Sequence, residues 1–183
     1  MIDWSFIELL EGRRLAGYVP DPEGSNSGVT IASGVDLGQI SPDIVATLPA
    51  DIKDAIQPYI GLRKVDAVDA LKLRPLVLTT SQCEVLNAAV RAPIVANLSS
   101  HYKRDAGVTF EAIPDAAQTV VCSVQFQYGT LWGRAPRFWE FCIRQNWPAV
   151  IDELRAFGDS YPSRRRKEAN YLAAALGLPQ ESV

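Results

Sequence analysis

Residues 12–38 interrupt a sequence that is otherwise patterned for helices, and this interruption limits the folds open to the chain. Residues 15–19 and 29–31 are strand-like, and Val35 is placed to extend the second of these segments. The stretch between them is dense in Pro, Gly, Ser and Asn, which are turn-forming residues. Two short strands are not stable alone, so they must pack against helices. We therefore predict an α+β fold that is mostly helical.

The first predicted helix ends where the interruption begins. Asp3 is a suitable N-cap and Gly12 a natural stop. On a helical wheel Glu11 lies on the side of Trp4 and Ile7, which would partly shield its carboxyl group. The face that we expect to be buried carries Ile2, Phe6 and Leu9. The helix is thus predicted to present Glu11 in a partly apolar setting.

Everything after Gln39 is predicted to be helical. The predicted segments are 42–45, 51–53 and 64–73, a long helix from a cap at Thr80 or Ser81 toward His101, a helix from Pro114 to Gly129, two helices that meet near Asn146, and a last helix that Ser163 caps and Gly177 ends. We expect one domain over residues 1–183. It would comprise a small N-terminal β-sheet lobe over about residues 1–80 and a larger helical lobe over about residues 81–183, with the ligand site in a cleft between them.

Composition excludes several classes of function. The formal net charge of −3 gives no support to a nucleic-acid partner. Three widely spaced cysteines and a single histidine do not form a zinc or disulfide pattern, so we expect no metal, no cofactor and three buried thiols. No apolar run is long enough to span a membrane, so stable membrane insertion is not expected. The acidic residues near the N-terminus argue against a signal peptide, so we expect a protein made in the cytoplasm.

Glu11, Thr30 and Asp36 are together suited to cleave a glycosidic bond. The reaction needs a carboxylic acid that protonates the leaving oxygen and a second, ionised carboxylate on the other side of the sugar. Glu11 in an apolar setting suits the first role, because desolvation penalises the charged form. Asp36, after a strand and between glycines, suits the second, and the Thr30 hydroxyl could orient a water. A separation of about 6.5–9.5 Å between the carboxyl groups would imply inversion of the anomeric centre.

The same residues belong to a longer series of motifs. The N-terminal part carries Glu11-Gly12, Leu15-x-Gly17-Tyr18-Val19-Pro20 and Ser27-Gly28-Val29-Thr30-Ile31-x-x-Gly34-x-Asp36-Leu37-Gly38. Later segments are Phe126-Gln127-Tyr128-Gly129, Pro136-x-Phe138-Trp139, Trp147 and Tyr161-x-Ser163-Arg164-Arg165-x-x-Glu168-Ala169. Together they resemble the phage-type lysozymes, and in particular the pesticin-like branch of bacterial toxins and phage endolysins, in which the order is Glu, then Thr, then Asp six residues later.

The resemblance implies a lysozyme-like fold and a muramidase that cleaves the β-1,4 bond between N-acetylmuramic acid and N-acetylglucosamine in peptidoglycan. It implies that Glu11 is the general acid, that Asp36 positions or activates the water, and that Thr30 helps to hold this water. It also places an arginine near Glu11, and Arg164 matches that arginine best. One departure is that Ala32 stands where many relatives have glycine.

Further residues are weaker substrate-binding candidates. Tyr128 and Arg134 flank two glycines in a segment that could border the cleft. Trp132 could stack on a sugar, whereas the helical spacing of Trp139 and Trp147 favours core positions. For the basic run that begins at Arg164 we keep two alternatives: a solvated first turn of the last helix, or a surface for anionic lipid and wall polymers.

Several roles fit these expectations. The favoured one is a monomeric, single-domain phage endolysin for host cell lysis, which would need a holin-type pore to pass from the host cytoplasm to the periplasm and cell wall. The alternatives are a lytic transglycosylase on the same fold, the catalytic domain of a bacteriocin-type toxin, and a non-catalytic module that binds the cell wall.

Overall fold

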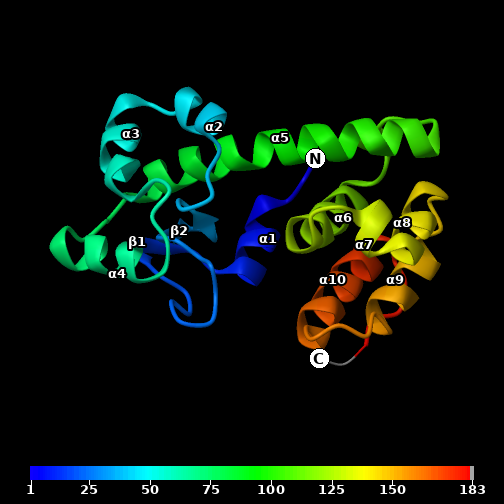
Figure 1. The fold of residues 1–183 in the computed structure, drawn as a ribbon. Coiled ribbons are helices and arrows are strands. Elements are labelled where there is room, and N and C mark those ends of the chain that lie inside the picture. Colours follow the sequence, from blue (N-terminus) through cyan, green and yellow to red (C-terminus); the bar gives the residue numbers. More distant parts are fainter. Residues whose placement is uncertain (182–183) are drawn as a thin grey trace. The chain divides into compact units, whose positions relative to one another are not determined.

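The computed structural model describes residues 1–181 and divides the chain into two compact units (Figure 1). The unit that we call the sheet unit comprises Glu11–Pro93. The helical unit comprises Met1–Leu10 and the chain from Ile94 onward. The boundary falls inside the longest helix, α5 (Thr80–Ala106), next to its Pro93. Helix predominates and the one sheet is small, so the predicted α+β, mostly helical, lysozyme-like class is confirmed.

The sheet unit is built on a three-stranded antiparallel sheet in the order β1-β2-β3. Its strands are β1 (Arg14–Tyr18), β2 (Thr30–Ala32) and β3 (Val35–Asp36). The prediction that Val35 extends the second strand is wrong, because the chain reverses at Ala32–Gly34 and Val35 begins a third strand. Ala32 and Gly34 take left-handed backbone angles, with φ of 55° and 81°, and these angles make the reversal.

Helices pack against this sheet and form a hydrophobic core with it. The sheet unit contains α2 (Pro42–Thr47), α3 (Ala50–Ile56), the 3-10 turn η1 (Gln57–Tyr59), α4 (Lys64–Leu73) and the first half of α5. Its core includes Val29, Ile31, Leu37, Ile52, Ile56 and Leu86, all at most 1% exposed. Helix α5 starts one residue earlier than the predicted cap at Thr80 or Ser81 implies, because Thr79 and Gln82 form a reciprocal capping box.

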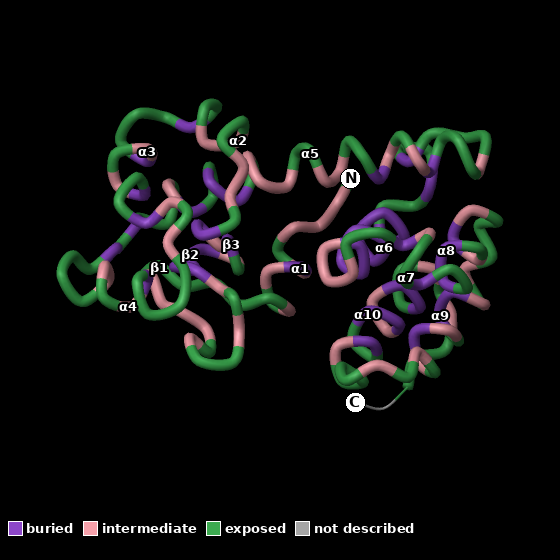
Figure 2. Tube along the Cα trace, viewed as in Figure 1, coloured by how far each residue is buried: buried purple, intermediate pink, exposed green. Residues whose placement is uncertain are grey.

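The helical unit packs around α6. It contains α1 (Trp4–Glu11, of which only Glu11 belongs to the sheet unit), η2 (Phe110–Ala112), α6 (Asp115–Tyr128), α7 (Leu131–Arg134), α8 (Pro136–Ile143), α9 (Trp147–Arg155) and α10 (Pro162–Ala175). All residues of α6 from Ala116 to Gln125 are buried, and Figure 2 marks this stretch in purple. Gly129 ends α6, and two helices, α8 and α9, meet near Asn146, as predicted; Asn146 is the N-cap of α9. The predicted cap of the last helix is wrong by two residues, since Tyr161 occupies the N-cap position and Ser163 lies inside α10.

Helix α1 has the predicted cap and part of the predicted buried face, because Ile2 and Phe6 pack partly buried against the helical core but Leu9 does not. The Asp3 carboxylate accepts a hydrogen bond from the backbone N–H of Phe6 at 3.0 Å, which confirms the N-cap. Ile7 is 1% exposed and packs in the helical core, whereas Leu9 is 82% exposed. The predicted buried stripe of Ile2, Phe6 and Leu9 rested on the number of apolar residues on each side of the helical wheel, and it therefore placed Leu9 in the core.

Cys83, Cys122 and Cys142 are buried and not disulfide-bonded, as predicted, and burial raises the pKa of the Cys122 thiol to about 12. Within residues 1–181, no three His, Cys, Asp or Glu side chains gather into a group that could hold a metal ion. None of the helices in that range combines the length and the apolar character that a membrane span requires.

Candidate active site

The β2–β3 hairpin brings two of the three predicted catalytic residues together. Thr30 and Asp36 are directly opposed partners in the antiparallel pair, so their side chains lie on the same face of the sheet. Thr30 is only 4% exposed, and its hydroxyl donates to the carbonyl of Gly28 at 3.4 Å. The lone pairs of the Thr30 oxygen are thus held in a set direction beside the carboxyl group of Asp36.

Three donors fix the Asp36 carboxylate. Oδ1 accepts the backbone N–H groups of Gly28 at 3.0 Å and Gly38 at 2.8 Å, and Oδ2 accepts the Gln39 side-chain amide at 2.7 Å. The Gly38 contact is an Asx-type turn, in which a side chain caps the backbone two residues on. A carboxylate has about four acceptor sites. Three are filled, which leaves about one for a further donor such as a water.

The backbone around Asp36 is too close for any side chain at Gly28 or Gly38. A Cβ atom at Gly28 would lie 2.4 Å from the carbonyl oxygen of Leu62 and 2.6 Å from the Cα of Gly38. A Cβ atom at Gly38 would lie 2.6 Å from the same carbonyl oxygen and 3.1 Å from Asp36 Oδ1. We call Gly28, Gly38 and Leu62 the glycine clasp. Glycine is required at positions 28 and 38 because the backbone segments approach each other closely there, and not because either residue needs a left-handed backbone conformation.

We expect Gly38→Ala to lower both stability and activity. The new methyl group would meet backbone, which cannot move aside as a flexible side chain can, so the unfolding free energy should fall by about 1–3 kcal/mol. The displaced Asp36 should cost about 10²-fold in turnover of cell-wall substrate. Urea denaturation followed by circular dichroism and turbidity clearing of cell walls would measure the two effects.

Gly133→Ala is the control for this variant, because the added Cβ would meet only the Thr130 hydroxyl, at 3.5 Å. It should change neither quantity noticeably. Equal behaviour of the two variants would contradict a clasp that positions Asp36.

The tip of the hairpin is tied to α5. The side-chain oxygen of Asn87 accepts the Ser33 N–H at 3.2 Å, and its amide nitrogen donates to the Ser33 hydroxyl at 3.0 Å. Asn87 is 2% exposed, so both bonds lie away from solvent. This tie holds the reversal in which Ala32 carries a positive φ. Glycine would take that angle without strain, whereas alanine costs about 1–2 kcal/mol.

Glu11 is the third predicted catalytic residue and the first residue of the sheet unit. It ends α1 and is followed by Gly12, whose φ of 75° turns the chain into β1. Glu11 is exposed, Ile7 lies in the helical core, and Trp4 makes an edge contact with Phe126. The partial shielding of Glu11 by Trp4 and Ile7 stays a prediction.

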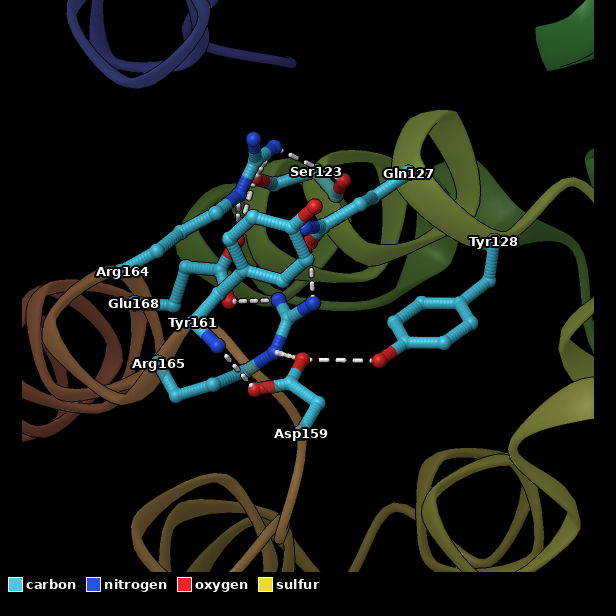
Figure 3. Close-up of polar contacts among 8 residues, drawn as sticks. All are labelled: Ser123, Gln127, Tyr128, Asp159, Tyr161, Arg164, Arg165 and Glu168. Carbon is cyan, nitrogen blue, oxygen red and sulfur yellow. Dashed lines mark hydrogen bonds and ion pairs between the residues drawn. The ribbon is translucent and has the colours of Figure 1, made fainter. Parts of the chain in front are cut away.

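In the helical unit, the predicted basic run is part of a buried ionic cluster (Figure 3). We define this cluster as Ser123, Gln127, Tyr128, Asp159, Arg164, Arg165 and Glu168. Arg165 and Glu168 are 1% and 0% exposed, and the Arg165 guanidinium bonds Glu168, Gln127 and, through Nε at 2.9 Å, Asp159. The alternative of a solvated first turn is therefore wrong for Arg165.

Arg164, the predicted substrate-side arginine, is held by the same cluster. Its Nε donates to Glu168 Oε1 at 3.1 Å, and its Nη2 donates to the Ser123 hydroxyl at 3.1 Å and to the Ser123 carbonyl at 3.2 Å. The Ser123 hydroxyl in turn donates to Glu168. These contacts fix one side of the guanidinium. The pairing of Arg164 with Glu11 would join residues of different units and stays a prediction.

Tyr128 is committed to the cluster by its hydroxyl, which donates to Asp159 Oδ2 at 2.7 Å. Burial favours a higher pKa for the Asp159 carboxyl. The hydrogen bonds from Tyr128, the Tyr161 backbone and Arg165 outweigh burial, and the pKa of Asp159 lies below its usual value. Burial and the bond to Asp159 raise the pKa of the Tyr128 hydroxyl. Tyr128 thus has a structural role that the sequence did not indicate, and its sugar-binding role stays a prediction.

The other candidates lie elsewhere in the helical unit. Arg134 ends α7 and is exposed. Trp132 is half-buried and stacks on the His101 ring at 3.6 Å between centroids, so one of its faces is already covered. His101 lies within α5, not after it, because that helix continues to Ala106. Trp139 is a core residue, as predicted.

A pocket of about 350 Å³ lies on the helices of the sheet unit, and its lining is mostly apolar. Its lining residues are Pro42, Val45, Ala46, Lys53, Gln57 and Ile60. None of the predicted catalytic residues lines it, so we do not assign it to the reaction.

Sequence reasoning missed the residues that position the site. Gln39 binds Asp36 directly, and an amide three residues after a candidate carboxylate was a readable signal. The pattern Asp36-x-Gly38 is typical of an Asx turn and could have indicated the backbone donor at Gly38. Asn87 and Leu62 are distant in sequence from the hairpin, and nothing local marks them.

The chain matches a known protein family. The profile of a family described as pesticin, a bacterial toxin homologue of phage lysozyme, C-terminal part, matches residues 1–148. The match includes Glu11, Thr30 and Asp36 and ends before the basic run at Arg164. No curated protein matches the chain significantly.

Proposed function

We propose, from the premise that this chain belongs to the pesticin family of phage-lysozyme homologues, that it is a muramidase. The family relationship supports peptidoglycan hydrolysis as the general activity. The finer assignment is cleavage of the β-1,4 bond between N-acetylmuramic acid and N-acetylglucosamine. The observation that carries it is the pairing of Thr30 with an Asp36 carboxylate that keeps about one acceptor site open.

In the proposed reaction Glu11 is the general acid. Its proton passes to the glycosidic oxygen as the bond from C1 of the muramic acid to that oxygen breaks, and the glucosamine leaves with a free 4-hydroxyl group. Glu11 is exposed in the free protein, so in this proposal the bound glycan covers its carboxyl group and excludes water from it. In this proposal the apolar surroundings of the Glu11 carboxyl group form only when the glycan binds; they are not provided by helix α1.

Asp36 and Thr30 would hold the water that attacks C1 from the opposite face. The open site on Asp36 Oδ2 takes one hydrogen of this water, and the Thr30 oxygen fixes its direction. As the water oxygen bonds to C1, the proton that it loses passes to Asp36. Because the carboxylate is already engaged by three donors, it suits the holding of a water better than direct attack on the sugar. We therefore propose inversion at the anomeric centre.

The products distinguish this reaction from its closest alternative. We expect digests of purified cell wall to contain reducing N-acetylmuramic acid ends and the first-formed anomer to be α. Mass spectrometry of the digest and proton NMR of the early products would measure these. A lytic transglycosylase would leave 1,6-anhydromuramic ends, with no water added, and a wall-binding module would leave no fragments. Either result would overturn the proposal.

We further propose that the protein acts as a monomer, in an endolysin role, and reaches the wall through a holin-type pore. A bacteriocin-type toxin would use the same chemistry. Lysis timing in cells that express the chain with and without a pore-forming partner would distinguish the two routes, because a toxin would act from outside the cell.

A further inference from the structure

An arginine that the reaction described above does not use is anchored beside Asp36. The Arg63 Nε donates to the carbonyl of Gly38 at 3.2 Å. The Arg63 backbone also pairs with Gly28 in an antiparallel bridge. Gly28 and Gly38 are the two residues whose N–H groups bind Asp36 Oδ1. Arg63 is thus tied to both glycines of the clasp, to Gly38 through its guanidinium and to Gly28 through its backbone.

The rest of this guanidinium is available to a ligand. An arginine has five N–H donors, and Arg63 uses one of them for Gly38. Within residues 1–181 its Nη1 and Nη2 make no further hydrogen bond or ion pair. Arg63 is exposed, so a ligand can approach at little desolvation cost. The four remaining donors form a planar fork that matches the two oxygens of a carboxylate.

Local stability does not explain an arginine at this position. Arg63 occupies the N-cap of α4 and its side chain makes no cap hydrogen bond. Ser, Thr, Asp and Asn are the residues that stabilise this position, and a cation is unfavourable at the positive end of the helix dipole. The next residue, Lys64, has a φ of 52°, an uncommon backbone angle for a residue other than glycine. A strained and poorly capped helix start beside a candidate site is typical of a segment kept for function.

From these contacts we infer that Arg63 binds a carboxylate of the glycan substrate next to the bond that is cleaved. This inference rests on the proposed function, because it takes peptidoglycan as the ligand. Peptidoglycan offers this chemistry from two sources: the carboxylates of the peptide stem, and the lactyl carboxylate of muramic acid where the stem has been removed. Arg63 would make the enzyme prefer acidic wall glycan to a neutral glycan of the same backbone.

The test compares wild type and Arg63→Ala on two preparations of one cell wall, native and with its carboxyl groups converted to amides by carbodiimide coupling to ammonia. On native wall we expect the half-saturating concentration to rise by about three- to tenfold in the variant, with the maximal rate unchanged. On amidated wall the two proteins should be equal. A third substrate is glycan from which an amidase has removed the peptide stems. If the defect of Arg63→Ala persists on this substrate, the ligand of Arg63 is the lactyl carboxylate. If the defect disappears, the ligand is a carboxylate of the peptide stem.

The matched control is Arg74→Ala, since Arg74 is an exposed arginine of the same unit whose side chain, among residues 1–181, makes no hydrogen bond or ion pair to the hairpin. It should match wild type on every substrate. A defect of Arg63→Ala that is equal on native and amidated wall, or no defect on either, would overturn the inference and leave Arg63 as a brace for Gly38. Should Arg63→Ala fail to fold by circular dichroism, Arg63→Gln keeps a donor and takes its place. A wild-type protein that degrades none of the preparations would overturn the proposed function instead.

Discussion

Glu11→Gln is expected to lower the rate of cell-wall hydrolysis by about 10³-fold or more while the protein stays folded. A general acid contributes about 10²–10⁴-fold, and the amide has the shape of the acid but no proton of suitable acidity to give. Because Glu11 is exposed at the end of α1, its replacement removes no core packing, and the circular dichroism spectrum should stay that of the wild type. Release of reducing ends and circular dichroism would measure the two quantities.

Glu8→Gln provides the matched control, because Glu8 lies on the same helix one turn earlier and the substitution is chemically identical. It should keep activity within about twofold of wild type, because Glu8 has no role in the proposed reaction. A Glu11→Gln protein as active as Glu8→Gln would remove Glu11 from the mechanism.

The leaving group separates the acid from the water-holding residues. An aryl glycoside with an acidic phenol needs no proton on its leaving oxygen, so Glu11→Gln should recover most of its rate on such a substrate. Asp36→Asn should not, because the attack of water is needed whatever the leaving group. Equal recovery of both variants would contradict the assignment of two different roles.

The local part of this site could be predicted from sequence, and the supporting part could not. The chemistry of the residue types and the family motif selected Thr30 and Asp36, but the reversal at Ala32–Gly34 that pairs them was not predicted, because the sequence pattern indicated one strand continuing to Val35. The approach of the Leu62 carbonyl to Gly28 and Gly38 and the hydrogen bonds of Asn87 to Ser33 depend on where the chain before α4 and helix α5 return to the hairpin. Such contacts follow from tertiary packing, which no short pattern encodes.

The errors in the fold have the same cause. Leu9 and Ile7 are similarly apolar, so a helical wheel of α1 does not distinguish them. Ile7 is buried because its side of the helix faces the helical core. One alternative kept for the basic run at the last helix was a solvated first turn, which is the usual environment of arginine. Burial of Arg165 becomes acceptable only through Glu168 and Asp159, which lie three residues after and six residues before it. Charge pairing over those spacings was visible in the sequence, but its burial was not.

Glu168→Gln is expected to destabilise the helical unit by about 3–5 kcal/mol. The carboxylate is 0% exposed and accepts from Arg164, Arg165 and the Ser123 hydroxyl. The amide keeps the volume but removes the charge, and it turns an N–H group toward one of the two guanidiniums. Removal of one partner of a buried ion pair leaves the other charge without compensation, and this accounts for the size of the expected loss.

Tryptophan fluorescence during urea denaturation would measure this loss in the right unit, since Trp4, Trp132, Trp139 and Trp147 all lie in the helical unit and none in the sheet unit. The control is Lys167→Gln, which removes an exposed charge from the same turn of α10 and should stay within about 0.5 kcal/mol of wild type. A Glu168→Gln protein as stable as this control would mean that Arg165 is compensated by Asp159 and Gln127 alone. If instead the expected loss is found, the stability of the helical unit depends on an ionic cluster that also holds Arg164, the arginine for which the family resemblance implies a role at the substrate.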